Sequence, residues 1–479
     1  MGKSTTSKAP AERAYPERPD LLFATVRPIG VPDARFYEHL EARLRFFGYH
    51  PSRIKLSGLL EEIATAEGRL DEFAHPDERA KILIEEGNRV CEDAENAAAI
   101  AKLGVERIAE ARGGDEPNAF IIDSLKRGEE VDLLREIYGE SLMVFGLQAK
   151  SKVRERALAE RYRLERASMS ADDLERKVSE LIEQDLSQAE QNEYGQNVLL
   201  TFPMADVFID TGGRTGHQVR RVVDLLFRNP QRPAATMAEL AMSAADRVSA
   251  TSPELGRRVG AVIVKENSIV SVGANVHPET TRIPAVDASV LDIHDIVGDI
   301  FRLLLADGAI LSEDATNQLQ RDRDSYVNRL LQNQLKKAKV RSLTEFQTTV
   351  HAEMNALMAS LKLGIRLDGA HVFVTTFPCH NCAKHLVTLG LDVIYLEAYP
   401  RSRAEAMYGP YVRRHFKPFT GVAPRRFSPL FYVPEDRKAA DGGIRPVDRM
   451  AVPNIPNAPS REEIIRRERL VRGAMGGSL

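Results

Sequence analysis

The sequence predicts an α/β protein with two domains, each built on a sheet that lies between helices. Short apolar runs alternate with longer charged, helical stretches over the first 230 residues, which is typical of buried strands in a parallel sheet. A proline-containing segment at 228–233 separates these runs from a second set of strands and helices. The length of 479 residues also exceeds the roughly 150 residues of an average domain, so two or more domains are expected.

The first predicted domain covers residues 20–230, after a polar and proline-containing stretch at 1–19 that we expect to be mobile. Its first strand is Leu21–Val26, which is followed by a loop at 27–33 and by a helical pattern through Phe47. Further apolar runs predict strands at 119–123, 141–147 and 205–210, and the charged stretch at 151–189 predicts helix.

The second predicted domain covers residues 236–435 and mixes strands with helices, which favours a three-layer α/β/α architecture. Its elements in order are a helix at 237–248, a hairpin-like strand pair at 259–264 and 268–272, a polar helical insertion at about 277–345, a helix from Thr349, a strand at 371–375, a helix from Cys379 and a strand at 393–396.

The C-terminal residues 436–479 form a basic arm that ends in a predicted helix. Ser460 and Glu463 have the spacing of a capping box at the start of the helical pattern 460–472. The tail from 401 onward carries a net charge of +8, although the whole chain has a net charge of −3. The arm is therefore a local basic feature of an overall acidic chain.

Composition and charge exclude several classes of protein. An apolar fraction of 43% and a charged fraction of 28% are ordinary for a globular chain. The net charge of −3 gives no global attraction to nucleic acid or to an anionic membrane, and no apolar run reaches the roughly 18 residues of a spanning helix. Three cysteines cannot form a disulfide framework, so we expect a cytoplasmic protein in a reducing environment.

The sharpest signal for function is a histidine and a pair of cysteines. His351-Ala352-Glu353 is followed, after 24 residues, by Pro378-Cys379-His380-Asn381-Cys382. One imidazole and two thiolates are ligands that suit zinc, and three protein ligands leave one of its four positions open, as in catalytic sites. Such a centre makes hydroxide available at neutral pH. Glu353 stands two residues from the histidine and is suited to carry protons beside the metal.

The spacing of these residues favours a catalytic site over a structural one. Cys379 and Cys382 are three residues apart, so they face the same way on the first turn of a helix. If both ligand sets begin helices, two positive helix ends point at the metal and stabilise thiolates. The alternative is a structural zinc whose fourth ligand is another histidine: His371, His380 or His385.

This joint pattern resembles the zinc-dependent cytidine/deoxycytidylate deaminase superfamily over residues 236–430. The resemblance implies that His351, Cys379 and Cys382 bind Zn²⁺ and that Glu353 is the proton shuttle. In such enzymes hydroxide attacks C4 of cytosine and ammonia leaves.

Neighbouring segments narrow the substrate to a deoxycytidine nucleotide. Residues 259–264 look like the first strand of deoxycytidylate deaminases, and Gly273-Ala274-Asn275 resembles the Gly-x-Asn motif of the family. The resemblance implies that Asn275 contacts the sugar and base. The other implied substrate contacts are Ala352, Tyr399, Arg258 and Arg401. Nucleotide-level deaminases often have Gly-Tyr-Asn-Gly at this place, whereas the run here is Gly273-Ala274-Asn275-Val276-His277-Pro278, which argues against the family's allosteric triphosphate site.

The first domain carries a resemblance of its own. Residues 121–138 and 195–210 look like a P-loop kinase-like module, although the loop at 27–33 lacks the Gly-Lys-Ser/Thr of a phosphate-binding loop. Such a module ahead of a deaminase domain is the layout of anti-phage dCTP deaminases. That likeness, over about 20–430, implies deamination of dCTP, dCMP or both in antiviral defence, a homo-oligomer, and a regulatory nucleotide at the first domain. The eroded loop argues against ATP hydrolysis.

Three other functions compete with this interpretation. A housekeeping dCMP deaminase has no evident use for the 230 residues that precede the zinc motif. A polynucleotide deaminase could bind the phosphate backbone of a nucleic acid with the basic tail. Against this, aromatic residues make up only 6% of the chain. A non-catalytic nucleotide sensor would not need Glu353. The sequence therefore favours a free-nucleotide deaminase with no role for a membrane or for nucleic acid.

Overall fold

The computed structural model describes residues 18–71, 76–113, 116–165, 194–278, 288–307, 312–335, 348–396, 403–432 and 437–473, with a few short pieces between 166 and 193 and at 338 and 340. The chain forms two compact units: Met1–Pro233 together with Pro429–Leu479, and Ala234–Ser428. Within the described ranges, no helix combines the length and the apolar character needed to cross a bilayer.

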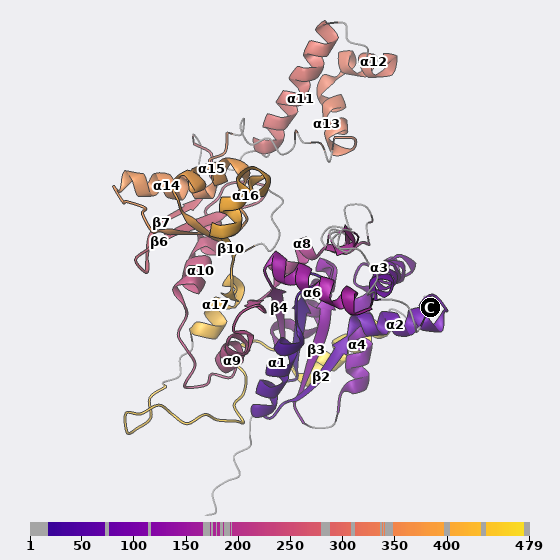
Figure 1. Cartoon of the computed structure of the whole chain (residues 1–479), viewed down its shortest axis with the longest axis vertical. Helices are drawn as coiled ribbons and strands as arrows, with labels where there is room; N and C mark the ends of the chain where they lie inside the picture. The colour runs from indigo at the N-terminus through magenta and orange to yellow at the C-terminus, as the bar shows by residue number, and fades with distance from the viewer. Residues whose placement is uncertain are drawn as a thin grey trace, which may run out of the picture. The chain divides into compact units, whose positions relative to one another are not determined.

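The first unit contains a parallel sheet, as predicted (Figure 1). Its strands lie in the order β5-β4-β1-β3-β2. Their bounds are β1 Leu21–Val26, β2 His50–Lys55, β3 Asn118–Leu125, β4 Leu142–Gln148 and β5 Val207–Asp210. Strand β2 was not predicted, because only Ile54 of its six residues is buried and the other five are exposed or half-buried. Because β2 is an edge strand of the sheet, much of it faces solvent, so its sequence contains no continuous apolar run.

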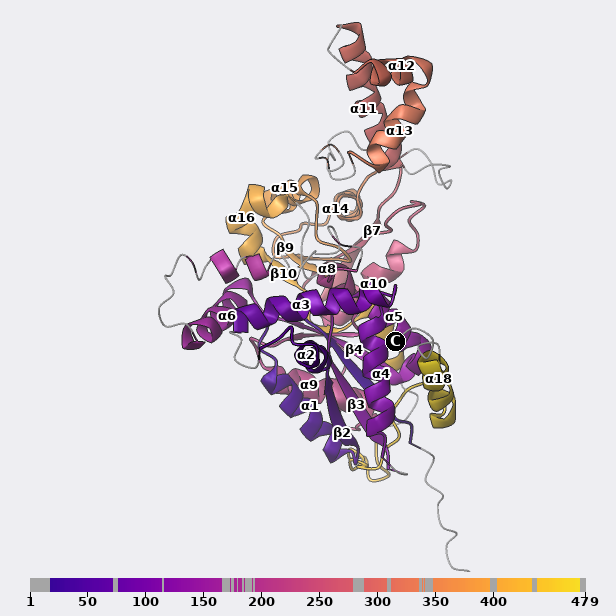
Figure 2. The same ribbon diagram turned by 90° about the vertical axis from the view of Figure 1, so that its right-hand side faces the viewer.

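Helices cover this sheet in groups (Figure 2). One pair, α1 and α9, packs together, and α2, α3 and α4 form another group that contacts β2 and β3. The helices of the unit are α1 Ala34–Phe46, α2 Leu56–Ala66, α3 Pro76–Asp93, α4 Ala99–Ala111, α5 Gly128–Tyr138, α6 Ser151–Glu165, α8 Val198–Thr201, α9 Thr215–Leu226 and α18 Arg461–Gly473, with short 3-10 turns at Gly139–Ser141 and Phe202–Met204.

The C-terminal helix α18 belongs to the first unit because a buried carboxylate anchors it there. Glu468 accepts hydrogen bonds from the Tyr138 hydroxyl at 2.7 Å and from the Arg112 guanidinium at 2.5 Å. Burial raises the pKa of Glu468, and the adjacent Arg112 opposes that shift. At the start of the helix, the Ser460 hydroxyl accepts from the Glu463 amide at 3.2 Å, so this half of the predicted capping box is present.

The second unit has a mixed five-stranded sheet in the order β10-β9-β8-β6-β7. Strand β6 runs antiparallel to β7 and β8, whereas β8, β9 and β10 are parallel. The five strands are β6 Gly260–Lys265, β7 Ser268–Ala274, β8 His371–Val374, β9 Asp392–Tyr395 and β10 Phe416–Pro418, and the two-residue β11 Gly421–Val422 is not part of this sheet. The helices beside them are α10 Met237–Ser249, α14 Ala352–Lys362, α15 His380–Thr388, α16 Ala404–His415 and α17 Pro424–Phe431.

Two glycines show that helices cover both faces of this sheet. A Cβ on Gly260 would lie 1.8 Å from the Ala245 carbonyl oxygen in α10, and a Cβ on Gly273 would lie 2.4 Å from the Ala356 nitrogen in α14. Gly273 pairs with Ala261, the neighbour of Gly260, so the two glycines face opposite sides of the sheet. The predicted three-layer arrangement is therefore present.

The insertion between β7 and α14 contains three helices, in agreement with its predicted helical character. They are α11 Ala288–Ala306, α12 Glu313–Arg321 and α13 Arg323–Gln332. Ile293 and Val297 of α11 pack against Val327 and Leu331 of α13 in a small core. The insertion thus buries apolar side chains within itself.

The close contact at Gly273 yields a stability prediction. Gly273→Ala should lower the free energy of unfolding by about 2 kcal/mol or more, because its methyl group meets the backbone of α14, which cannot move aside like a side chain. Chemical denaturation followed by circular dichroism measures the loss. Gly298→Ala in α11 is the control, since its Cβ would lie 3.5 Å from its nearest neighbour. Equal stability of the two variants would contradict the prediction.

Candidate metal centre and active site

His351 is held at the start of α14 by the strand pairing that precedes it. Val350 forms a two-bond bridge with Val276, with N···O distances of 2.9 and 2.8 Å. The side-chain amide of Asn355, in the first helical turn, donates to the Ala274 carbonyl at 2.9 Å. The helix was predicted from Thr349 but begins at Ala352, because the extended bridge at Val350 makes His351 the N-cap.

The two cysteines lie at the start of α15. Cys379 is the N-cap residue, and its Sγ accepts from the Cys382 backbone amide at 3.4 Å. The loop before them leaves β8 through Thr375, whose backbone amide donates to the Gly260 carbonyl at 3.1 Å. The Thr375 hydroxyl accepts from the Gly260 amide at 3.2 Å. Strand β6 therefore positions both the cysteine loop and, through β7, the histidine.

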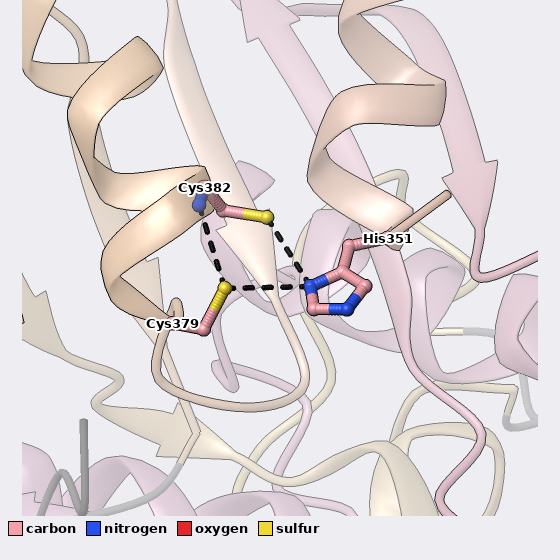
Figure 3. A group of neighbouring side chains, drawn as sticks. All are labelled: His351, Cys379 and Cys382. Carbon is pink, nitrogen blue, oxygen red and sulfur yellow. Dashed lines mark hydrogen bonds between the residues drawn. The ribbon is translucent and has the colours of Figure 1, made fainter. Parts of the chain in front are cut away.

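The three side chains converge on one point (Figure 3). His351 Nδ1 lies 3.4 Å from Cys379 Sγ and 3.4 Å from Cys382 Sγ. All three ligand atoms lie within 4.8 Å of one another, and this is the one such group of three or more found in the described part of the chain. His371, His380 and His385 are not members of it, which removes the fourth ligand that a structural zinc would need.

The donor set and its spacing fit zinc. A tetrahedral zinc ion with sulfur at about 2.3 Å and nitrogen at about 2.1 Å separates the two donors by about 3.6 Å. The observed separations of 3.4 Å are close to that value. Two thiolates and one imidazole leave one tetrahedral position for a further ligand.

Even without a metal ion, the hydrogen bonds within the cluster favour a thiolate at Cys379 and a neutral thiol at Cys382. Hydrogen bonds from the Cys382 thiol and from His351 lower the pKa of Cys379 to about 4. Donation to Cys379, together with burial, raises the pKa of Cys382 well above its usual value. The hydrogen bond with Cys379 also raises the pKa of His351. The N-termini of α14 and α15 add positive potential at the same place.

Glu353 is buried in the first turn of α14, with 3% of its surface exposed. Burial raises the pKa of its carboxyl group, and the charge on Cys379 raises it further. The Cys382 thiol lies within hydrogen-bond reach of it. A carboxyl group that is easily protonated and adjacent to the metal ligands is suited to move protons.

Of the predicted substrate contacts, Asn275 and Ala352 are buried and Arg258 is exposed. The Asn275 side chain is buried, and its Oδ1 accepts from the Val259 amide at 2.7 Å while its Nδ2 donates to the Arg257 carbonyl at 3.0 Å. These bonds fix the amide and leave one N–H and one lone pair for a ligand. Ala352 is buried beside His351, and Arg258 is exposed before β6.

Two predicted contacts, Tyr399 and Arg401, lie outside the described residues. Glu254 was not predicted, yet its carboxylate accepts from the Thr349 hydroxyl at 3.0 Å and its charge helps to raise the pKa of His351. No motif marks Glu254 in the sequence, because a single glutamate after a proline is a common surface pattern.

Residues 235–398 match the family model described as the cytidine and deoxycytidylate deaminase zinc-binding region. The chain is 43% identical over 47 residues to ComE operon protein 2 of Bacillus subtilis (strain 168), a match that covers 10% of this chain and 25% of that protein. It is 34% identical over 55 residues to the deoxycytidylate deaminase of Enterobacteria phage T2, covering 11% and 29%. The chain thus spans only about a quarter of the length of these relatives.

A solved structure, the apo form of the dCMP deaminase from the cyanophage S-TIM5, is similar over 38% of this chain and 97% of its own, with 20% identity and a TM-score of 0.23. The family match is the finding that bears on the site. It spans all three clustered side chains and Glu353, so the candidate zinc ligands lie inside the stretch that is similar to deaminase zinc-binding regions.

The cluster predicts the metal content of single-cysteine variants. The purified protein should contain one zinc per chain, and Cys382→Ala should lose most of it because two donors hold zinc far more weakly than three. Inductively coupled plasma mass spectrometry measures the ratio. Cys91→Ala is the matched control, since Cys91 is a buried free cysteine outside the cluster. Equal zinc loss in both variants would refute this ligand assignment.

Proposed function

We propose that this chain is a zinc-dependent deaminase of free deoxycytidine nucleotides, which converts dCMP, dCTP or both to the deoxyuridine nucleotide and ammonia. The observation that carries the proposal is the buried Glu353 carboxyl beside a Cys-Cys-His cluster, at two helix N-termini. The match of residues 235–398 to the deaminase zinc-binding region supports it.

Glu353 is the proton carrier in this mechanism. Zinc held by His351, Cys379 and Cys382 would supply Lewis acidity and lower the pKa of water to about 7. The Glu353 carboxylate takes one proton from the attacking water and delivers it to N3 of the cytosine, and it then moves the second proton from the new hydroxyl group to the departing amino group. Oxygen becomes bonded to C4 of cytosine, the C4–N bond breaks, and ammonia leaves. Because burial raises the pKa of Glu353, the carboxyl holds this proton between the two steps.

The remaining contacts orient the nucleotide. The Asn275 amide is fixed by the backbone of residues 257 and 259, so its free N–H and lone pair can read the sugar and base without reordering. We assign a phosphate contact to Arg258, which is exposed on the same loop. A cytosine with a deoxyribose fits these contacts with any number of phosphates, so dCMP and dCTP are both substrates to test.

A role in antiviral defence is the physiological part of the proposal. Removal of dCTP would deprive a replicating phage of a DNA precursor. The support is the layout: a complete parallel α/β unit accompanies the zinc-binding unit, and the catalytic chemistry alone does not require it.

The first test is a product assay on zinc-loaded protein with cytidine, dCMP, dCTP, CTP and a cytosine-containing DNA strand offered separately. Chromatography of the uracil products should show conversion of dCMP or dCTP and none of the DNA strand. Conversion of the strand alone would establish a polynucleotide deaminase instead. Absence of product from all five substrates, with zinc bound, would refute the enzyme assignment.

Substitution of the proton carrier separates catalysis from metal binding. Glu353→Gln should lower kcat by about 10²–10⁴-fold, because the amide cannot accept and return the proton. Its zinc content should stay at the wild-type level, since Glu353 is not among the clustered donors. Glu266→Gln, on the exposed turn between β6 and β7, should keep full activity. Wild-type turnover by Glu353→Gln would overturn the mechanism.

A further inference from the structure

The loop at 250–259, between α10 and β6, bonds to the segment that leads into the histidine of the zinc cluster. The Glu254 carboxylate of this loop accepts from the Thr349 hydroxyl at 3.0 Å. Thr349 stands two residues before His351. Both partners are half-buried, so water competes with this bond less than it would at an exposed site. The bond therefore ties a carboxylate to the segment that carries one of the zinc ligands.

The backbone of the loop holds Glu254 in place for this contact. The Glu254 amide donates to the hydroxyl of the buried Ser252 at 3.3 Å. The Ser252 amide in turn donates to the Ser249 carbonyl at the end of α10, at 3.0 Å. These two bonds connect Glu254 to a helix, so its carboxylate is already supported by the fold when it accepts from Thr349.

The negative charge of Glu254 acts on the imidazole of His351. The hydrogen bond with Cys379 raises the pKa of His351 most, and the charge of Glu254 adds to that shift. The Nδ1 atom of the ring faces the two sulfur atoms, whereas Nε2 lies on the other side of the ring (Figure 3). A carboxylate near a histidine ligand fixes the orientation of the ring and makes it a stronger donor to the metal.

The segment before α14 is held from two directions. The bridge between Val350 and Val276 fixes the path of its backbone. The contact between Thr349 and Glu254 holds the same segment from the loop that follows α10, and it brings a negative charge with it. The backbone bridge cannot supply that charge, so the two contacts have different roles.

The same loop also holds the proposed substrate contact Asn275. The Arg257 carbonyl and the Val259 amide bond to its side chain, at 3.0 and 2.7 Å. Glu254 precedes these residues by only a few positions. One short loop is thus hydrogen-bonded both to Asn275 and to the segment that carries His351.

We propose that Glu254 is a positioning residue of the zinc centre, whose carboxylate, held by Thr349, orients His351 and strengthens its binding to zinc. The proposal rests on the zinc centre of the proposed function but not on its reaction. The competing interpretation is that Glu254 only stabilises the loop, in which case its loss would leave the zinc affinity of the folded protein unchanged.

The test measures zinc affinity by competition between the full-length protein and a chelator of known affinity, without any nucleotide. Glu254→Ala should bind zinc about 10–100-fold more weakly than the wild type, as is typical when the partner of a histidine ligand is removed. Thr349→Val, which removes the hydroxyl, should also bind zinc more weakly. Thr349→Ser keeps the hydroxyl and should bind zinc like the wild type. Circular dichroism confirms that each variant is folded.

The double variant Glu254→Ala/Thr349→Val tests whether the two side chains act through one contact. Its zinc affinity should be no lower than that of Glu254→Ala alone, because the hydroxyl no longer has a carboxylate to hold. Effects that add in the double variant would contradict the proposal. Wild-type zinc affinity in folded Glu254→Ala would overturn it.

Matched controls separate this contact from a general effect of the loop. Thr251→Val removes a hydroxyl of the same loop that bonds to the Val248 carbonyl at 2.7 Å, and Glu266→Gln removes an exposed carboxylate. Both should bind zinc like the wild type, and a loss in Thr251→Val equal to that in Thr349→Val would refute the assignment.

A second substitution covers the case in which Glu254→Ala does not fold. Glu254→Gln keeps the size of the side chain and loses only its charge, so it should still weaken zinc binding, by about tenfold. Wild-type affinity in Glu254→Gln would count against the proposal. Because no nucleotide is present, this result is independent of whether the protein deaminates, and a failure here would leave the proposed function intact.

Discussion

The contact between β7 and α14 at Gly273 is the constraint on which the candidate active site depends. The backbone of the strand approaches the backbone of the helix so closely that no side chain fits between them. The Val276–Val350 bridge and the bond from Asn355 to the Ala274 carbonyl hold the start of the helix at the end of the strand. His351 is therefore positioned by the close approach of the two backbones, by the strand bridge and by the Asn355 side chain, and these contacts fix its place at the site.

The metal cluster concentrates groups that are unfavourable without a cation. Cys379, Cys382 and Glu353 place two thiols and a carboxyl group in a largely buried space, where each additional negative charge raises the pKa of the next. The N-termini of two helices offset part of this repulsion. A divalent cation would offset the rest, so the burial that makes Glu353 a suitable proton carrier also makes the site depend on its metal.

The sequence predicted what lies in apolar runs and in a spaced motif. Strands such as Leu21–Val26 were found because both of their faces are buried. The cluster of His351 with the two cysteines followed from spacing and ligand chemistry, and its members do converge. Strand β2 and the anchoring of α18 by Glu468 were not predictable, since each depends on partners distant in sequence and on polar residues that resemble a surface. The roles of Asn275 and Arg258 remain predictions.

The contacts of the loop at 27–33 also depend on a residue distant in sequence and could not be predicted. Its lack of a glycine-lysine pair indicated a weak phosphate site, but only the fold shows what replaces the anion. Asp185, more than 150 residues away in the chain, accepts from the Ile29 amide and pairs with Lys126. Backbone amides in a buried loop must find an acceptor, and an internal carboxylate provides it permanently. The Asp185 carboxylate thus satisfies the Ile29 amide from within the protein.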